Sequence, residues 1–323
     1  MLDNFCQGTG DPPHSYPLVT VGIPTYNRAE GLRRTLECIT TQTYKNLEII
    51  VSDNCSPGPE TEAVVREFMA RDNRIQYYRQ EINRGPTVNF RFVLEKATGE
   101  YFMWAADDDE WESPFIYLLI ELLLKRPDVS GAMSGVKIID DHGKIVKTIR
   151  YPLISKPDYS RFRLAFFASS HDEITFLIYG LYRTEKAKHF YKNSDNTFGK
   201  DMLMVCDMLL SAKFGYIDEI LHIRHVHLKG TAELYKEEEL GKNYRDSLNY
   251  LKLFFRFGPY LLRSSNIPLK HKFWLPFMSI RQGIWIGRIY INRIFNVLLV
   301  IARKNSQLDK LLTHVSKKLK YRK

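Results

Sequence analysis

The feature that most constrains the fold of this chain is a regular alternation of apolar runs and amphipathic helical segments between Leu18 and Lys125. Segments with apolar residues at helical spacing separate runs that are rich in β-branched and aromatic residues. This order is typical of a mostly parallel sheet with helices on both faces, and we therefore expect an α/β, Rossmann-like fold. The predicted strands are LVTVGI (18–23), LEIIVSD (47–53), RIQYYRQ (74–80) and EYFMWAA (100–106).

Local signals predict where several elements begin. Asn27 is expected to cap the first helix, with Glu30 three residues on as its capping-box partner. Ser113 and Pro114 are expected to begin the helix after the fourth strand. The segments VSGAMSGVKIID and GKIVKTIR, joined by DDHG, predict a β-hairpin.

A polar cluster follows each of the four predicted strands at its carboxyl end. In chain order these clusters read PTYNR, SDNCS, NRGPTVN and ADDD. In open α/β sheets, ligands bind outside the carboxyl ends of the strands, where the strand order reverses. Four clusters at one edge of a sheet therefore predict a nucleotide-type site.

Three consecutive aspartates, Asp107, Asp108 and Asp109, end the fourth strand. Adjacent like charges repel, so the cluster needs a positive partner unless it is a solvated acidic turn. Mg²⁺ or Mn²⁺ suits such a site, because these ions bind through one or two carboxylates and complete their shell with water and substrate phosphates. The chain has no GxxxxGK[ST] loop, and no GxGxxG follows the first strand, which argues against a P-loop NTPase and a dinucleotide site.

Residues 18–135 resemble the nucleotide-binding half of the family 2 glycosyltransferases, which have the GT-A fold. The matching segments are VTVGIPTYNR (19–28), QTYKNLEIIVSDNCS (42–56), NRGPTVN (83–89) and GEYFMWAADDDEW (99–111). The resemblance implies inverting transfer from a nucleotide-diphosphate sugar. It also implies that the acidic cluster is the DXD-type motif that holds Mn²⁺ or Mg²⁺, with Asp108 as the first expected ligand and Asp107 and Asp109 beside it.

The resemblance further implies which residues contact the nucleotide and the diphosphate. The alternatives are a turn with a helix cap for the residues after the first strand, an Asx-turn for Asp53 and a surface arginine for Arg84. Two positions depart from the family pattern: Ala106 stands where an acid is usual, and the base-recognising acid pair is Asp53-Asn54. The expected donor-binding residues are Pro24, Thr25, Tyr26, Arg28, Asp53, Asn54, Arg84, Asn89, Asp107 and Arg224.

The second half of the chain offers a candidate base. ITFLIYGLYRTEKAKHF (174–190) predicts an apolar strand and the start of a helix, and FGKDMLMVCDMLLSAKFG (198–215) predicts a helix that opens at Asp201 and stops at Gly215. The resemblance implies that an acid at this place is the general base, which takes the proton of the acceptor hydroxyl. The alternative for Asp201 is an acid that merely stabilises the helix N-terminus.

The segment HIRHVH (222–227) contains three histidines. Alternation along a strand would place His225 and His227 on one face and His222 with Arg224 on the other. The resemblance suggests an Arg/His pair that closes over the diphosphate, so Arg224, His225 and His227 are candidates, and the two histidines are candidate metal ligands. Structural histidines are the alternative.

The net charge of +10 is concentrated at the C-terminal end. Residues 270–323 contain thirteen lysines and arginines and one acid, Asp309, so the rest of the chain is slightly negative. Arginines interrupt the apolar residues of 270–304, and no run is long enough to span a membrane. Aromatic residues next to basic ones predict helices that lie on an anionic membrane surface. A helical hairpin packed on the body or a dimer contact is the alternative.

We expect a loose leader (1–17), a nucleotide-sugar-binding half (18–135), an acceptor-binding half (136–235) and a helical, basic, membrane-associating tail (236–323). The four scattered cysteines are typical of reduced thiols, and the N-terminus does not resemble a signal peptide. RQGIW (281–285) differs from the QxxRW motif of processive family members, which favours transfer of one sugar.

The sequence thus predicts a glycosyltransferase that is cytoplasmic and peripheral on the inner face of the cell membrane. Its expected acceptor is a lipid-linked or cell-surface glycan, such as an O-antigen or capsule unit. We expect no nucleic-acid partner, and a homo-oligomer is left open. The rival functions are a sugar nucleotidyltransferase, whose glycine-rich signature is absent, and a non-enzymatic polyanion-binding protein that uses the basic tail.

Overall fold

The computed structural model describes residues 16–156, 163, 165–166, 172–192, 200–226, 252 and 254–287. The chain divides into two compact units. The first comprises Met1–Ser155, Phe176–Asn193 and Ala212–Val226, and the second comprises Lys156–Thr175, Ser194–Ser211 and His227–Lys323. Most of the leader, His227 and most of the predicted tail fall outside the described residues.

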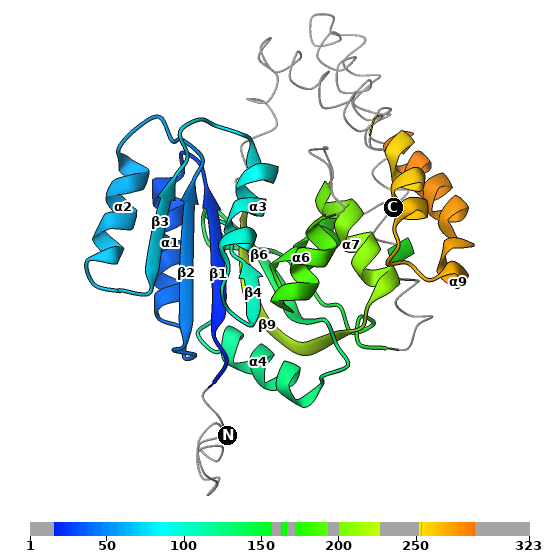
Figure 1. Ribbon diagram of the computed structural model, residues 1–323, viewed down its shortest axis with the longest axis horizontal. Helices are drawn as coiled ribbons and strands as arrows, with labels where there is room; N and C mark the ends of the chain where they lie inside the picture. Colours follow the sequence, from blue (N-terminus) through cyan, green and yellow to red (C-terminus); the bar gives the residue numbers. More distant parts are fainter. Residues whose placement is uncertain are drawn as a thin grey trace, which may run out of the picture. The chain divides into compact units, whose positions relative to one another are not determined.

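The first unit is built on one mixed sheet, which has nine strands in the described part of the chain. Their order is β3-β2-β1-β4-β8-β6-β9-β5, and β7 pairs with β6. Figure 1 shows the neighbouring strands β3, β2, β1 and β4. The pairs β3-β2, β2-β1, β1-β4 and β6-β9 are parallel, and the others are antiparallel. The strands are β1 (Val19–Thr25), β2 (Leu47–Asp53), β3 (Ile75–Arg79), β4 (Tyr101–Trp104), β5 (Glu110–Trp111), β6 (Gly131–Asp140), β7 (Ile145–Ile149), β8 (Leu181–Arg183) and β9 (Phe214–Val226).

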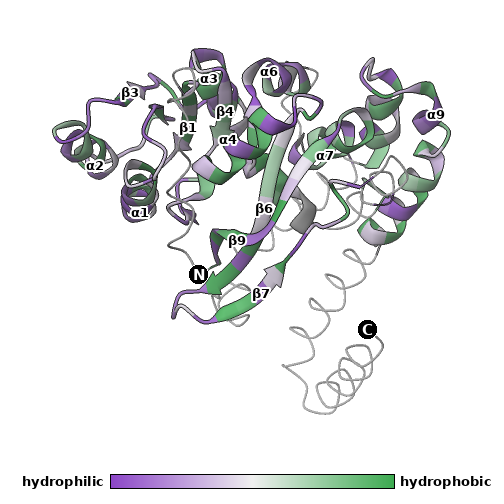
Figure 2. Cartoon of the chain, turned by 90° about the horizontal axis from the view of Figure 1, so that it is seen from below, coloured by the Kyte–Doolittle hydropathy of each residue, from purple (hydrophilic) through white to green (hydrophobic). Residues whose placement is uncertain are grey.

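The four predicted strands of the first hundred residues form the parallel block, which confirms the α/β prediction. Every residue of β1, β2 and β4 is buried, as expected for strands covered on both faces. Helices α1 and α2 lie on one face and α3 on the other (Figures 1 and 2). The helices of this unit are α1 (Ala29–Thr40), α2 (Glu60–Met69), α3 (Pro86–Lys96), α4 (Phe115–Lys125) and α6 (Thr184–Lys192).

The predicted cap of α1 is wrong. Asn27 has a left-handed backbone (φ 54°), and its N–H donates to the Ser56 hydroxyl at 2.8 Å. Asn tolerates this conformation better than most residues, so it makes a sharp turn between β1 and the helix. Arg28 occupies the N-cap position without a side-chain cap, and α4 likewise begins after Pro114 without a cap from Ser113.

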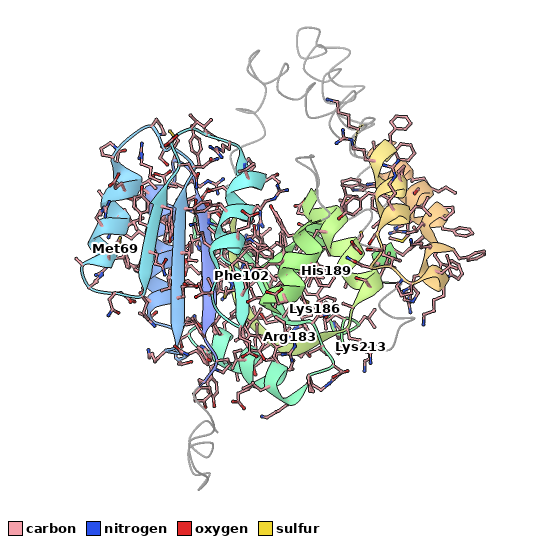
Figure 3. All side chains as sticks on the ribbon, viewed as in Figure 1. Met69, Phe102, Arg183, Lys186, His189 and Lys213 are labelled. Carbon is pink, nitrogen blue, oxygen red and sulfur yellow. The ribbon has the colours of Figure 1, made fainter. Side chains whose placement is uncertain are left out.

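The middle of the chain confirms one prediction and corrects another. Strands β6 and β7 form the predicted hairpin, whose turn uses Gly143 at φ 73°. In the segment 174–190 the first apolar residues belong to a 3₁₀ helix, η1 (Asp172–Tyr179), and the predicted strand is limited to the short β8; the predicted start of a helix is confirmed by α6. A short apolar run cannot be assigned by periodicity alone. Arg183 on β8, labelled in Figure 3, donates to the carbonyls of Leu123 and Val129 and so joins β8 to α4.

Strand β9 contains a pronounced irregularity opposite β6. Ser134 lies opposite Ile217, whereas Val136 lies opposite His222. Five steps along β9 therefore correspond to two steps along β6. Extra residues of this kind form β-bulges, which bend a strand and re-aim the side chains beyond them.

The described part of the second unit is helical. It includes α7 (Lys200–Ser211), α9 (Leu269–Lys272) and the helical residues 254–263 and 275–287. The buried carboxylate of Asp207 accepts the Ser264 hydroxyl at 3.0 Å, which joins α7 to the residue that follows the helical residues 254–263. The predicted helix stop at Gly215 is wrong: α7 ends at Ser211, and Gly215 belongs to β9. Within the described residues, no helix is both long and apolar enough to cross a bilayer.

Candidate functional site

A cleft of about 450 Å³ lies at the carboxyl ends of the parallel strands in the first unit. Strand β1 lies between β2 and β4, so this edge is where the strand order reverses, and such a position is where open α/β sheets bind ligands. The residues lining the cleft are Pro24, Thr25, Tyr26, Arg28, Asn54, Asn83, Pro86, Asn89, Phe90, Ala106, Asp107, Asp108, Tyr179 and Arg224. The structure therefore brings together most of the donor-binding residues that the sequence predicted.

The acidic turn after β4 has a positive partner within the chain. Asp107 is almost buried, and its carboxylate accepts the Thr25 hydroxyl at 2.8 Å and the Tyr26 N–H at 3.4 Å. Its other oxygen lies 3.3 Å from Nη1 of Arg28, and the same nitrogen contacts the Asp108 carboxylate. Burial raises the pKa of Asp107 to about 6, although Arg28 and the Thr25 hydrogen bond act against this rise.

Asp109 turns away from the cleft. Its side chain is 1% exposed, and one carboxylate oxygen lies 2.9 Å from Nε2 of His222. The His222 ring stacks on Trp111 with centroids 5.0 Å apart. Thr35 on α1 donates its hydroxyl to the carbonyls of Ala106 (3.0 Å) and Asp109 (2.9 Å). Asp109 thus stabilises the acidic turn through contacts on the side that does not line the cleft. This position does not support the prediction that Asp109 is a metal ligand.

His222 was not among the predicted site residues, yet it contacts Asp109 of the acidic turn. The alternation predicted for HIRHVH holds where it is described. Trp111 lies opposite His222 on β5, and Arg224 on the same face lines the cleft and lies over the Phe176 ring at 4.5 Å. His225 is on the opposite face and pairs with Glu110, away from the cleft. Among the described residues, no group of three His, Cys, Asp or Glu side chains could hold a metal ion.

The end of β2 differs from the resemblance-based prediction. Asp53 is fully buried and does not line the cleft. One of its oxygens accepts the N–H and hydroxyl of Ser56 (2.9 and 2.6 Å), and the other accepts Tyr77 Oη (3.0 Å) and Arg79 Nη1 (3.3 Å). Burial and the neighbouring Asp53 raise the pKa of Tyr77. Both oxygens of the Asp53 carboxylate are thus hydrogen-bonded to other groups of the protein.

The neighbouring amides shape the wall of the cleft. Asn54 donates to Asn83 Oδ1 at 2.8 Å and accepts the backbone N–H of Arg84 at 3.0 Å, which holds the loop before α3. The Arg84 side chain is not among the lining groups. Asn89 is buried and donates to the carbonyls of Thr25 (3.3 Å) and Ser52 (2.8 Å), so it braces the ends of β1 and β2.

The acidic turn fits a hard divalent cation. Asp107 and Asp108 present carboxylate oxygens to the cleft, and the Asp108 side chain is the more accessible, at 25% exposed against 11%. Mg²⁺ and Mn²⁺ take oxygen ligands from one or two carboxylates and fill the other positions with water and phosphate. Asp108 is thus the residue best placed to hold such an ion.

The predicted base lies in the second unit. Asp201 is exposed in the first turn of α7, and the Met202 N–H donates to its carboxylate at 2.9 Å. Asp207, on the same helix, is fully buried. Of the two acids of α7, Asp201 is the one that is exposed to solvent.

Comparisons with known proteins agree with this fold. The chain is 33% identical over 132 residues to the GalNAc(5)-diNAcBac-PP-undecaprenol beta-1,3-glucosyltransferase of Campylobacter jejuni, and 33% identical over 148 residues to the putative colanic acid biosynthesis glycosyl transferase WcaA of Escherichia coli K12. These alignments cover 41% and 45% of this chain, and 41% and 51% of the two relatives. The chain thus spans about half or less of the curated relatives it matches.

Among solved structures, S. aureus TarS 1–349 has a TM-score of 0.60 at 15% identity, covering 93% of this chain and 87% of TarS. Its complex with UDP-GlcNAc gives a TM-score of 0.58, covering 82% of this chain and 72% of that one. At this identity the likeness shows the shared GT-A fold. The family model described as glycosyl transferase family 2 matches residues 20–190. Because this match extends over more than half of the chain, the protein is an enzyme of glycosyltransferase family 2.

Proposed function

We propose that the enzyme is a metal-dependent, inverting glycosyltransferase. It would move a single sugar from a nucleotide-diphosphate sugar to a hydroxyl of a lipid-linked or cell-surface glycan. The observation that carries this proposal is the cleft at the reversal of strand order, which combines Asp107 and Asp108 with the cations Arg28 and Arg224. The two relatives named above have names that describe a transfer to an undecaprenol-linked acceptor and colanic acid biosynthesis.

Several groups of the cleft would have a part in this reaction. Tyr26 and Asn54 would contact the nucleoside, and Arg28 and Arg224 would bind the diphosphate, since guanidinium groups match phosphate geometry. Thr25 and the Tyr26 N–H keep the Asp107 carboxylate in place. A bound Mg²⁺ or Mn²⁺ held by Asp108 would neutralise charge on the leaving diphosphate.

The proton of the acceptor hydroxyl needs a base, and Asp201 is the residue we propose. Replacing it by Asn (Asp201→Asn) should lower kcat at least about 100-fold, the lower range for loss of general base catalysis, while donor affinity persists. Steady-state kinetics and calorimetric binding of the nucleotide sugar measure the two quantities.

Glu185→Gln is the matched control, because Glu185 is also an exposed acid in the first turn of a helix, α6. It should leave kcat unchanged. If Asp201→Asn weakens donor binding and leaves the turnover of bound donor intact, Asp201 is not the base.

We also propose that the enzyme lies on an anionic membrane surface. The helical segment 275–287 has two apolar faces: one is buried through Leu275, Met278 and Ile286. The other exposes Phe277, Ile280 and Ile284, each by at least half, and Phe273 continues it. A second apolar face on a helix is normally covered, and the adjacent lysines and arginines favour a cover of anionic lipid.

A double substitution tests this membrane surface. Phe277→Asp with Ile280→Asp should lower co-sedimentation with anionic liposomes at least tenfold, because apolar burial and charge attraction are both weakened. Ile145→Asp with Val146→Asp on β7 is the control, since these apolar residues are equally exposed in the other unit. If the wild-type chain does not co-sediment with liposomes, and the Phe277→Asp, Ile280→Asp variant has a different oligomeric state from wild type in gel filtration, the surface is a dimer contact instead.

A further inference from the structure

Arg28 connects the two cleft carboxylates in an unusual manner. It stands at the N-cap of α1, and its side chain is 55% exposed. A single nitrogen, Nη1, contacts both Asp107 and Asp108. Burial alone would lower the pKa of Arg28, yet the two carboxylates raise it overall. The guanidinium therefore occupies the place beside these oxygens where a divalent cation would bind.

The surroundings of this ion pair allow Arg28 to leave. The long side chain is more than half exposed, so rotating it outward would leave no buried charge on the arginine. Asp107 keeps its hydrogen bonds from Thr25 and Tyr26 when Arg28 moves. Thr35 continues to hold the backbone of the turn. The carboxylates thus stay in position, but their mutual repulsion then requires another cation.

Arg183 provides a contrast within the same sheet. It donates to the carbonyls of Leu123 and Val129 and to the Tyr101 hydroxyl from three different nitrogens. Such an arginine cannot move without breaking several hydrogen bonds of the fold. Arg28, by contrast, contacts Asp107 and Asp108 through one nitrogen only, so its side chain can rotate away without breaking hydrogen bonds of the backbone.

We propose that Arg28 is an exchangeable counter-cation. It neutralises Asp107 and Asp108 in the ligand-free enzyme, yields Asp108 to the divalent cation, and then binds the diphosphate. Because the metal must displace a guanidinium, the metal alone binds weakly. The diphosphate offers Arg28 a new partner, so nucleotide and metal strengthen each other's binding. This inference rests on the proposed function.

The test measures Mn²⁺ binding to the full-length chain by electron paramagnetic resonance, first alone and then with UDP or GDP. Arg28→Gln should bind Mn²⁺ alone about tenfold more tightly than wild type and lose the enhancement by nucleotide, within the 5–150-fold range of site coupling. Arg28→Lys, which keeps the charge, should fall between the two. Arg33→Gln is the control, since Arg33 is on the same helix and pairs with Glu67 outside the cleft, and it should behave as wild type.

A second variant confirms which site is measured. Adding Asp108→Asn to Arg28→Gln should remove the gained Mn²⁺ affinity, and thermal melting should show both variants folded. If Arg28→Gln binds Mn²⁺ no better than wild type while wild type binds Mn²⁺ and nucleotide together, the exchange is overturned and the proposed function stands. If wild type binds neither Mn²⁺ nor any nucleotide, both proposals are overturned.

Discussion

Two aspartates at the same edge of the sheet, Asp53 and Asp107, have very different surroundings. Asp53 follows β2 and accepts four hydrogen bonds from groups that the fold itself fixes, including Tyr77 and Arg79. Asp107 follows β4 and shares the exposed guanidinium of Arg28 with Asp108. Both carboxylates are buried and both have an arginine. The two carboxylates therefore differ in the number and attachment of their partners, and not in burial or in the presence of an arginine.

Ionised Asp107 in the acidic turn also lowers the stability of the folded protein. The raised pKa of Asp107 means that its ionised form is less favourable in the folded protein than in the unfolded chain. Perturbed carboxyls of this kind are common at functional sites, where a ligand supplies the compensating charge. The two aspartates consequently predict opposite results for substitution: loss of activity at the end of β4, and loss of stability at the end of β2.

The largest effect is expected at Asp108. Asp108→Asn removes one ligand and one charge from the proposed metal site, and we expect transfer to fall more than about 1000-fold, equivalent to about 4 kcal/mol of transition-state stabilisation. The melting temperature should stay within a few degrees of wild type, because the side chain is partly exposed. EDTA should reduce wild-type activity to the same level, and full activity in EDTA would refute metal dependence.

The second effect concerns the stability of the β2 end. Asp53→Asn should lower the free energy of unfolding by about 3 kcal/mol, since it leaves Arg79 and Ser56 without their charged acceptor. Urea denaturation measures this loss. Asp128→Asn is the control, because that exposed pair with Arg126 should contribute less than about 1 kcal/mol. A large rise in nucleotide Kd with unchanged stability would instead support the role of Asp53 in reading the base.

The smallest effect is a pH dependence at Asp107. Its pKa is raised to about 6, so lowering the pH through 6 protonates the folded protein first. The contribution of Asp107 to stability is thus fully present below its ordinary pKa of 3.8 and is lost as the pH rises from there to about 6, whereas Mn²⁺ affinity should fall about tenfold per pH unit below 6. Melting curves and Mn²⁺ titrations from about pH 3.5 to 8 follow both trends. Asp107→Asn should flatten both, and an unchanged profile in that variant would assign the titration elsewhere.

The sequence was sufficient to predict the parallel block and most of the cleft. Each strand of that block is a local apolar run, and the parallel arrangement brings residues such as Thr25, Asn54 and Asp108 to one edge. What escaped prediction depends on pairings between distant segments. The partners of Asp53 come from β3, and His222 meets Asp109 across 113 residues of sequence. The local sequence around a polar residue does not show whether its side chain will be exposed or will be buried against a partner that is distant in the sequence.

The irregularity of β9 also constrains how this part of the enzyme can change. Between Ile217 and His222 the strand holds three residues more than the facing part of β6 requires, an odd number. Ile217 and His222 nevertheless pair with Ser134 and Val136, which share one face of β6, so the bulge interrupts the usual alternation of side chains. A change of one residue between Ile217 and His222 can therefore be taken up by the bulge without exchanging the faces beyond it. A deletion of Ile223, beyond the bulge, would instead bring His225 to the place of Arg224.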